Sequence, residues 1–289
     1  MQNAEECLKS GSPYKDLHVY FINGVVTPGD EADLGEDFLG TWLEGESSFL
    51  FFNAPSRGRV DALLERRPEL SFAEEHCFSY EEWQGTRLEP VQIGPFLIRS
   101  PWDKTDAREG ELSIVLDPGV VFGTGIHPTT RDCLRAMAWL RGRAPIETVL
   151  DLGTGTGVLA LASARLGANK VWSVDLNPLC VKTTRRNVRL NQLEAVVEVL
   201  EGRAEDFAEK PADLVVANIH YEVLKDLVER EKFRERPWLI ISGLMRSQGK
   251  DIKGTLERHG LTIVREWDGE GTWTTMLVSG QNAQNTQSA

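Results

Sequence analysis

The feature that most constrains the fold is a regular alternation of apolar runs and helix-like stretches from residue 148 onward. Continuous apolar runs, such as 214–217, are typical of parallel strands buried on both faces. The alternation predicts an α/β fold with a doubly wound sheet, which binds ligands at the carboxyl ends of strands where the winding reverses. The predicted strands are 148–152, 170–176, 196–200, 213–219, 238–244, 262–267 and 273–279, and the predicted helices are 158–166, 178–191, 204–209, 221–235 and 246–259.

A smaller unit is predicted before this sheet. Its pattern is strand, helix, strand, strand, helix and strand, which favours a small α+β ferredoxin-like sandwich over residues 1–80. Residues 81–115 are interrupted by prolines and are interpreted as a connector with short β-like pieces at 96–99 and 112–116. We assign 116–280 to the catalytic domain, and we expect 1–16 to fray and 281–289 to form a disordered tail. The predicted elements of the small unit are strands 18–26, 39–44, 48–53 and 71–80 and helices 29–38 and 57–67.

Charge is unevenly distributed along the 289 residues. The net charge is −12, and the first 100 residues, with 18 acidic and 8 basic side chains, carry −10 of it. An acidic unit repels phosphate backbones and attracts a basic protein, although a merely solvated acidic surface is the alternative. We therefore expect a basic protein partner and no direct nucleic-acid binding. Separately, we expect a monomer.

Neither a membrane segment nor a metal site is predicted. No apolar run approaches the roughly 20 residues of a membrane span, and the first residues have neither a basic nor an apolar segment typical of a signal peptide, so we expect a soluble cytoplasmic protein. The four cysteines are far apart and are interpreted as reduced thiols, without a disulfide framework or a zinc site. They are Cys7, Cys77, Cys133 and Cys180.

The sharpest local motif is D-L-G-T-G-T-G at 151–157, between a predicted strand and a predicted helix. Glycines here let a ligand approach the backbone and expose helix N-terminal amides, although such a turn can also serve only to pack helix on strand. The dinucleotide fingerprint G-x-G-x-x-G requires glycine where Val158 stands, which disfavours an NAD-dependent dehydrogenase. The D-x-G-x-G-x-G form resembles the first motif of the seven-strand S-adenosylmethionine-dependent methyltransferases.

Two polar residues follow neighbouring strands. Asp175 ends the second predicted strand, where a carboxylate can accept both ribose hydroxyls of a nucleoside cofactor. Asn218 ends the fourth, where its amide can hold an amine toward an electrophilic methyl group, or can instead cap the next helix. Asn218 and Tyr221 resemble the Asn-x-x-aromatic arrangement of amino-group methyltransferases, while His220 is interpreted as a loop histidine and Tyr221 as a packing residue.

A third segment, 116–130, is rich in glycine and apolar residues. Phe122 and the glycines after it offer a flexible backbone beside an aromatic ring, which suits closure over a ligand. Thr129 and Thr130 precede a predicted helix at 131–140, and the simplest interpretation of them is an N-cap.

Taken in order, FGTGIHPTT (122–130), VLDLGTGTG (149–157), VDLNP (174–178), VVANI (215–219) and ISGLMRSQ (241–248) resemble the PrmA family of ribosomal protein L11 methyltransferases. The resemblance implies a class I methyltransferase that uses S-adenosylmethionine to trimethylate lysine side chains and the N-terminal amine of L11, with the small domain recognising the substrate. By motif position, Thr130, Gly153, Asp175 and Asn218 would contact the cofactor, and Asn218 would also act as the catalytic residue facing the amine. The chain departs from the family at two positions. Ile126 stands where the family's FGTGTHPTT block has threonine, and His220 stands where leucine is usual.

Three alternatives stay open at this point. The same fold could methylate an amino group of another protein or of nucleic acid, because Asn218 and Tyr221 alone do not select the substrate. A non-catalytic cofactor-binding protein and an NAD-dependent dehydrogenase are the others. For methyl transfer, a neutral amine must attack in line, and an apolar wall around Phe122 and Trp273 would disfavour the protonated ammonium.

Overall fold

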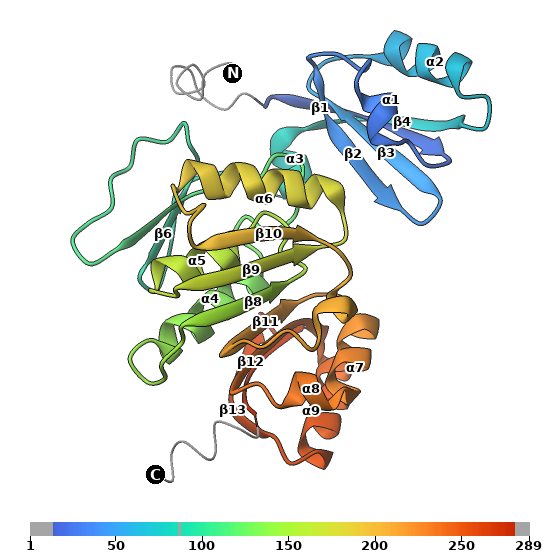
Figure 1. Ribbon diagram of the computed structural model, residues 1–289. Helices are drawn as coiled ribbons and strands as arrows, with labels where there is room; N and C mark the ends of the chain where they lie inside the picture. Colours follow the sequence, from blue (N-terminus) through green and yellow to red (C-terminus); the bar gives the residue numbers. More distant parts are fainter. Residues whose placement is uncertain (1–13, 86–87, 281–289) are drawn as a thin grey trace.

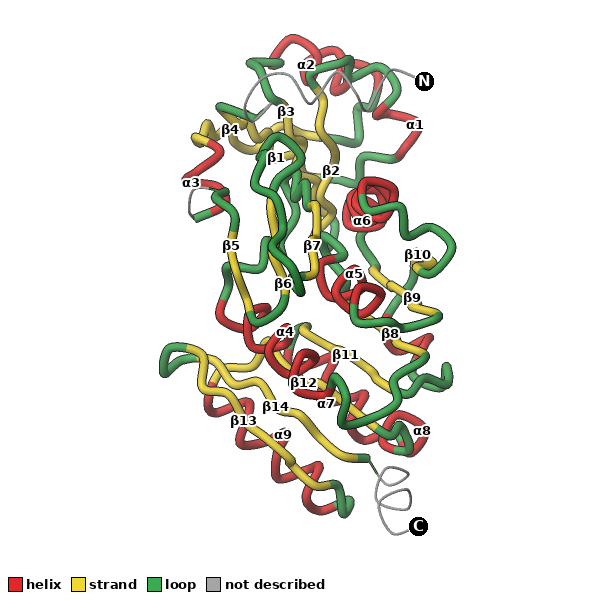
Figure 2. The backbone as a smooth tube through the Cα atoms, turned by 90° about the vertical axis from the view of Figure 1, so that its left-hand side faces the viewer, coloured by secondary structure: helices red, strands yellow, loops and turns green. Residues whose placement is uncertain are grey.

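The computed structural model describes residues 14–85 and 88–280. Figures 1 and 2 show a small N-terminal unit (residues 14–85) beside a larger C-terminal unit (residues 88–280). Over these residues no helix is long and apolar enough to cross a membrane. Within the same two ranges no group of three or more His, Cys, Asp or Glu side chains could hold a metal ion, and Cys77, Cys133 and Cys180 are free thiols. Cys7 and the tail at 281–289 lie outside the described residues.

The C-terminal unit is built on a mixed seven-stranded sheet of order β10-β9-β8-β11-β12-β14-β13, as the alternation predicts. The winding reverses between β8 and β11, which pair in parallel, and β14 runs antiparallel to both of its neighbours. The strands are β8 (Thr148–Leu152), β9 (Lys170–Asp175), β10 (Val197–Glu201), β11 (Leu214–Asn218), β12 (Trp238–Met245), β13 (Thr262–Gly269) and β14 (Trp273–Ser279).

Helices cover both faces of this sheet (Figure 1). Side chains alternate between the faces along each strand, so Val149 and Val216 belong to one buried cluster and Leu150 and Val215 to the other. The first cluster includes α4 (Pro128–Leu140), α5 (Val158–Arg165) and α6 (Pro178–Leu190), and the second includes α7 (Tyr221–Glu229), α8 (Glu231–Arg234) and α9 (Arg246–Arg258).

Two predicted helices differ from the structure. The stretch 221–235 is not one helix, because Arg230 adopts an extended conformation (φ −82°, ψ 125°) and separates α7 from α8. The stretch 204–209 forms only a short 3-10 turn, η1 (Ala204–Phe207). Both regions have the polar-apolar pattern of a helix, but a local break in the backbone is not visible in that pattern.

The N-terminal unit contains the six predicted elements in the predicted order. Its sheet has the order β2-β3-β1-β4, and every neighbouring pair is antiparallel. The helix expected at 29–38 is wrong in length: α1 is a single turn, and Gly35 then adopts φ +83° in a following turn. The elements are β1 (Asp16–Asn23), α1 (Pro28–Glu31), β2 (Phe38–Glu44), β3 (Ser47–Phe52), α2 (Arg57–Arg66) and β4 (Ser71–Ser79).

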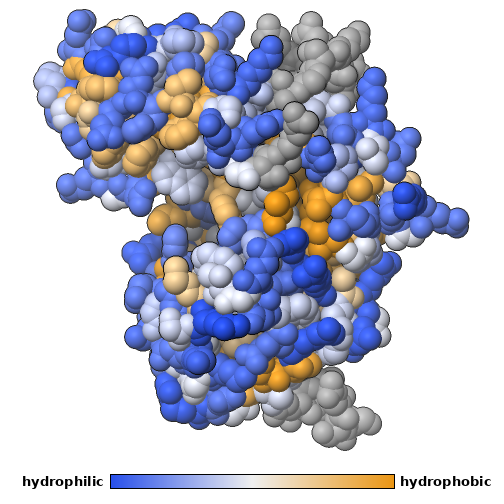
Figure 3. Space-filling model, turned by 180° about the vertical axis from the view of Figure 1, so that it is seen from behind, coloured by the Kyte–Doolittle hydropathy of each residue, from blue (hydrophilic) through white to orange (hydrophobic). Residues whose placement is uncertain are grey.

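The two faces of this smaller sheet have different neighbours. On one face Tyr20, Leu50 and Phe52 are fully buried together with Val60 and Leu63 of α2. The other face carries aromatic side chains and meets Val120, Val121 and Leu179 of the C-terminal unit. Figure 3 shows apolar side chains gathered in the recess where the two units meet. The residues of the N-terminal unit on this face are Leu17, Val19, Leu39, Trp42, Phe49, Phe51 and Phe78.

The segment expected to be a connector contains both predicted β pieces, at 96–99 and 112–116, together with a short helix that was not predicted. It begins with α3 (Tyr80–Gln84), which a Ser79–Glu82 capping box starts and Gly85 ends at φ +72°. A three-stranded sheet follows, of order β5-β6-β7, and its buried side chains belong to the same core cluster as α4 and α5. Its strands are β5 (Val91–Ile93), β6 (Phe96–Arg99) and β7 (Leu112–Val115).

The expectation that residues 1–16 fray is wrong at its C-terminal end. Residues 1–13 lie outside the described part of the chain, but Tyr14 is buried and Asp16 begins β1. The Tyr14 ring stacks on Tyr80 with 4.6 Å between centroids, and its hydroxyl donates to Asp117 of the C-terminal unit. The polar residues before β1 predicted an unpacked end, but the Tyr14 ring packs on Tyr80 and its hydroxyl binds Asp117.

Candidate active site

The glycine-rich turn (residues 153–157) connects β8 to α5 and leaves little room for side chains. Gly153 and Gly155 adopt φ +70° and +57°, in the left-handed region that favours glycine. A Cβ at Gly153 would lie 2.1 Å from Cγ2 of Ile219, and one at Gly155 would lie 2.6 Å from the carbonyl oxygen of Phe122. The turn is therefore packed between the end of β11 and the segment around Phe122.

Asp175 lies at the carboxyl end of β9, next to this turn. Its Oδ2 accepts the backbone N–H of Gly155 at 2.9 Å, and its Oδ1 accepts that of Asn177 at 2.9 Å. Burial raises the pKa of this half-buried carboxyl, while the two N–H donors act in the opposite direction. Each carboxylate oxygen keeps a further lone pair, so Asp175 can still accept hydroxyl donors from a ligand.

A second carboxyl, Asp151 of β8, forms a hydrogen bond with Thr154 of the turn. Its side chain is fully buried, Thr154 donates to Oδ2 at 2.6 Å, and Ser173 donates to the Thr154 hydroxyl at 2.7 Å. Oδ1 has no hydrogen-bond partner. Burial raises the pKa of Asp151 to about 7.

Asn218, at the end of β11, meets the first turn of α4. Its Nδ2 lies 3.5 Å from the hydroxyl of Thr130, which is buried. Gly243, at φ +83° in β12, packs closely against the end of β11. A Cβ there would lie 2.6 Å from the carbonyl of Ile219 and 3.1 Å from Oδ1 of Asn218. With Nδ2 directed to Thr130, Oδ1 is the hydrogen-bond acceptor that Asn218 can offer to a ligand.

The capping interpretations of these polar residues are wrong. Helix α4 begins at Pro128, three residues before the predicted start, and His127 is its N-cap, with Nδ1 accepting the Thr129 N–H at 3.4 Å. Proline suits the first helical position because its missing N–H is not needed there. The N-cap of α7 is His220 rather than Asn218, so Asn218 is not used for capping.

His220 is a loop residue before α7, and Tyr221 has a structural role. His220 is exposed, and the Tyr221 hydroxyl donates to Asp251 of α9 at 2.6 Å. This hydrogen bond joins α7 to α9, as a packing role for Tyr221 predicts. Tyr221 therefore does not stand beside Asn218 as a proton carrier.

An aromatic row joins the segment before α4 to the start of β14. His127 makes edge contacts with Phe122 and with Trp273, each at 5.1 Å between ring centroids. Burial, followed by the nearby Arg131, lowers the pKa of His127, which favours the neutral imidazole. The row combines Phe122, which is 57% exposed, with two half-buried rings and so offers an apolar wall.

A cavity of about 860 Å³ lies between the two units. Thr130, Gly153, Asp175 and Asn218 lie outside it, and its described lining comes from the aromatic face of the N-terminal sheet and from the segment around Phe122. Charged side chains at its walls include Glu44, Glu82 and Glu270, together with Arg131, which pairs with Glu270. Aromatic side chains that line it are Trp42, Phe49, Phe51, Phe78, Trp83 and Phe122.

The structure brings the four predicted site residues to one edge of the large sheet. Gly153, Asp175 and Asn218 end three adjacent strands, and Thr130 reaches Asn218 from α4. The aromatic face was not predicted as part of a site, although the spacing of Phe49 and Phe51 by two residues is a usable signal that both point to one face. Nothing in the local sequence indicated that Tyr14 and Asp117 meet, because they are far apart along the chain.

The strand order, with its reversal at the glycine-rich turn and its antiparallel β14, defines an α/β protein of the Rossmann-like methyltransferase class. Residues 67–281 match the family model described as "Ribosomal protein L11 methyltransferase (PrmA)", and the chain belongs to this family. The ribosomal protein L11 methyltransferase of Deinococcus radiodurans is 36% identical over 253 residues, which are 83% of this chain and 91% of that protein.

Other relatives match over a shorter length. The ribosomal protein L11 methyltransferase of Bacillus cytotoxicus is 40% identical over 178 residues, and the alignment spans 60% of this chain but only 56% of that protein. The crystal structure of ribosomal protein L11 methylase from Lactobacillus delbrueckii subsp. bulgaricus has a TM-score of 0.57 at 27% identity, covering 66% of this chain and 98% of that one.

Proposed function

We propose that this protein transfers methyl groups from S-adenosylmethionine to amino groups of a basic ribosomal protein, most directly L11. The observation that carries the proposal is the placement of Gly153, Asp175 and Asn218 at the carboxyl ends of three adjacent strands, at the point where the sheet winding reverses. Family membership supports L11 as the substrate, because the relatives from Deinococcus and Bacillus carry that name. A ribosomal substrate would place the reaction in the cytoplasm.

The side chains at this edge fit an adenosyl cofactor. Asp175 would accept the ribose hydroxyls, using the lone pairs that the two backbone donors leave. The glycine-rich turn would lie against the cofactor where no Cβ intervenes, and Thr130 and Asn218 would contact it from the α4 side. When bound, S-adenosylmethionine supplies a methyl group activated by the positive sulfonium.

Asn218 is the proposed catalytic residue. Its Nδ2 faces Thr130, so Oδ1 would accept an N–H of the substrate amine and direct the nitrogen lone pair along the line of transfer. A lysine amine has an unperturbed pKa of about 10.4 and must lose a proton before it attacks. The apolar wall of Phe122, His127 and Trp273 would disfavour the ammonium form and so lower that pKa.

We propose that the N-terminal unit recognises the substrate. Its strand order, read from β4 as β4-β1-β3-β2, and the packing of α2 on one face support the ferredoxin-like sandwich proposed for residues 1–80 within its described part, residues 14–80. The aromatic face opposite α2 suits a protein that buries apolar groups, and Glu44 and Glu82 at the cavity wall suit basic side chains of that protein. Residues 81–115 would then connect it to a catalytic domain at 116–280.

Two binding measurements test the cofactor assignment. Calorimetric titration with S-adenosylmethionine should show one site per chain, and NAD should not compete for it, because Val158 replaces the glycine of the dinucleotide fingerprint. Asp175→Ala should weaken S-adenosylmethionine binding more than it slows the transfer step. Tight NAD binding, or unchanged S-adenosylmethionine affinity in Asp175→Ala, would contradict the proposal.

A further inference from the structure

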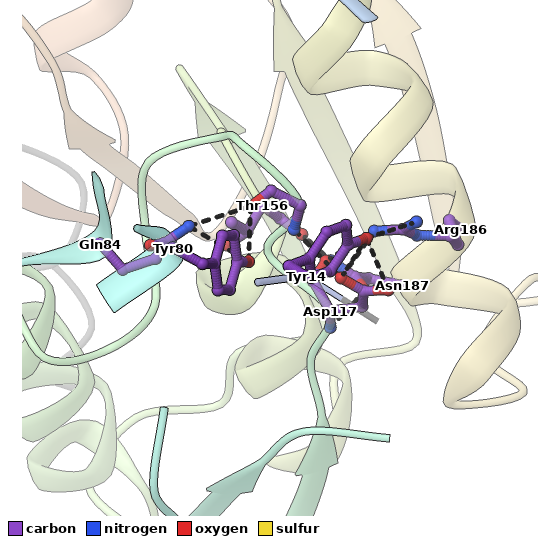
Figure 4. A network of polar contacts seen from close by, with 8 residues as sticks. Tyr14, Tyr80, Gln84, Asp117, Thr156, Arg186 and Asn187 are labelled. Atoms are coloured by element: carbon purple, nitrogen blue, oxygen red, sulfur yellow. Dashed lines mark hydrogen bonds and ion pairs between the residues drawn. The ribbon is translucent and has the colours of Figure 1, made fainter. Parts of the chain in front are cut away.

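We infer that side chains of the N-terminal unit hold the 117–127 loop in place and, through it, set the shape of the glycine-rich turn. Tyr14, Tyr80 and Gln84 are thus positioning residues for cofactor binding, although Tyr14 and Tyr80 lie in the unit proposed to dock the substrate and Gln84 lies at the start of the connector. The inference rests on the proposed function in one respect, that the ligand of the turn is S-adenosylmethionine. It adds that the two units share one network of hydrogen bonds (Figure 4).

The first part of this network comes from α3. The Tyr80 hydroxyl donates to the carbonyl of Gly119 at 2.6 Å, and Nε2 of Gln84 donates to the same oxygen at 2.9 Å. One residue further along the loop, the carbonyl of Val120 accepts Nε1 of Trp83 at 3.1 Å. Three side chains of the N-terminal unit therefore hold two consecutive carbonyls of the 117–127 loop.

The second part of the network fixes Asp117, the first residue of the loop. Asp117 is only 6% exposed, accepts the Tyr14 hydroxyl at 3.1 Å and pairs with Arg186 of α6 at 2.8 Å. The neighbouring Asn187 donates through Nδ2 to the carbonyl of Asp117 at 3.0 Å and to that of Thr156 at 2.8 Å. One amide group thus ties the start of the loop to the glycine-rich turn.

The third part joins the middle of the loop, at residues 122 and 123, to the same turn. The Thr156 N–H donates to the carbonyl of Phe122 at 3.2 Å, and its hydroxyl donates to that of Gly123 at 2.6 Å. The 2.6 Å between a Cβ built at Gly155 and the Phe122 carbonyl shows how closely the two segments pack. The loop and the turn therefore cannot move independently without breaking these hydrogen bonds.

The arrangement couples the N-terminal unit to the glycine-rich turn, although the two are far apart in the sequence. Donors from the N-terminal unit bind carbonyls at 119 and 120, and donors from the turn bind carbonyls at 122 and 123. A shift of the N-terminal unit would pull the loop, and the loop would alter the turn and the start of α4, where Thr130 lies. Coupling of this kind is reciprocal, so a bound cofactor would also restrain the N-terminal unit.

The experiment removes two hydroxyl groups and keeps both rings. Tyr14→Phe combined with Tyr80→Phe should weaken S-adenosylmethionine binding about fivefold or more in calorimetry. Without cofactor, the backbone amides of residues 119–123 should exchange with solvent deuterium faster than in the wild-type chain. Gln84→Met, which keeps the side-chain length and loses the donor, should shift both measurements in the same direction by less.

Tyr20→Phe is the matched control. Tyr20 is also buried and lies in β1, but its hydroxyl accepts the Ser56 N–H on the opposite face of the sheet, away from the loop. This variant should leave both the affinity and the exchange of 119–123 unchanged. If it weakens S-adenosylmethionine binding as much as the double variant does, the effect is general destabilisation and the inference is wrong.

The outcomes separate this inference from the proposed function. A wild-type chain that fails to bind S-adenosylmethionine overturns the proposed function, and the coupling to that ligand with it. A wild-type chain that binds, with unchanged affinity and exchange in the double variant and in Gln84→Met, overturns the inference alone. Local loosening of 119–123 together with weaker binding supports both.

Discussion

The two sheets of this protein use their faces and edges in different ways. The seven-stranded sheet is covered by helices on both faces, and its candidate site residues Asp175 and Asn218 lie at the carboxyl ends of its strands. The four-stranded sheet packs its helix α2 on one face and exposes aromatic side chains to a cavity on the other. Under the proposed function, cofactor chemistry takes place at the strand ends of one sheet and protein recognition on the face of the other, so substitutions at the two places should have separable effects.

The largest effect is expected at the edge. Asn218→Ala removes the acceptor that orients the amine and should lower kcat by about 100-fold, as misplacement of a reacting group does. S-adenosylmethionine affinity should change little, because the Asp175 carboxylate and the glycine-rich turn remain. Single-turnover kinetics and calorimetry on the same preparation measure both quantities.

A control for Asn218 comes from the opposite edge of the same sheet. Asn169 is exposed at the amino end of β9, and Asn169→Ala should leave kcat and cofactor affinity unchanged. If Asn169→Ala slows transfer as much as Asn218→Ala, the loss reports a general effect on the sheet rather than a role at the site.

The next effect is also at the edge but falls on binding. Asp175→Ala should raise the Kd for S-adenosylmethionine by about tenfold or more, since hydrogen bonds to a charged group contribute about 1.5–3 kcal/mol each. At saturating cofactor, kcat should recover most of its wild-type value. A variant that binds normally but turns over slowly would reverse the roles given to Asp175 and Asn218.

A smaller effect is expected on the aromatic face. Phe49→Ala removes a half-buried ring from the cavity wall and should raise KM for the protein substrate by about fivefold, with kcat and cofactor affinity unchanged. Phe38→Ala is the matched control, because Phe38 is equally half-buried but packs on Phe52 at the helix face. Equal changes in KM from both substitutions would remove the distinction between the two faces.

The last prediction concerns stability rather than activity. The pKa of Asp151 is about 7, above the value of about 4 expected in the unfolded chain, so the folded state holds an extra proton between these pH values. The free energy of unfolding should therefore fall as pH rises through this range, by about 1 kcal/mol per pH unit from this group. Asp151→Asn should flatten that slope in urea titrations at several pH values, and an unchanged slope would contradict the assignment.

Much of the fold follows from short-range patterns in the sequence. The apolar runs of the large sheet, such as 148–152 and 273–279, are predicted with their correct bounds because buried strands tolerate few polar residues. The glycine-rich turn and Asp175 are recognisable because their chemistry depends on residue type and on distance along the chain. Errors fall where backbone geometry decides, as at Gly35 and Arg230, since neither the turn nor the helix break changes the hydrophobic pattern.

The network that joins the units was not predictable in the same way. Tyr14 lies in a polar segment that resembles a frayed end, and its partner Asp117 is 103 positions away. Helix α3 is a different case, because Ser79, Glu82 and Gly85 have the capping pattern of a short helix and could have identified it. Local rules of this kind find elements, whereas contacts between distant elements require the three-dimensional structure.

The most direct test of the proposed function is the intact mass of purified ribosomal protein L11 after incubation with this protein and S-adenosylmethionine. The account predicts mass gains in steps of one methylene group, located on lysine side chains or the N-terminal amine and lost with Asn218→Ala. An unchanged mass of L11, with S-adenosylmethionine bound to the protein, would contradict the assignment of L11 as the substrate.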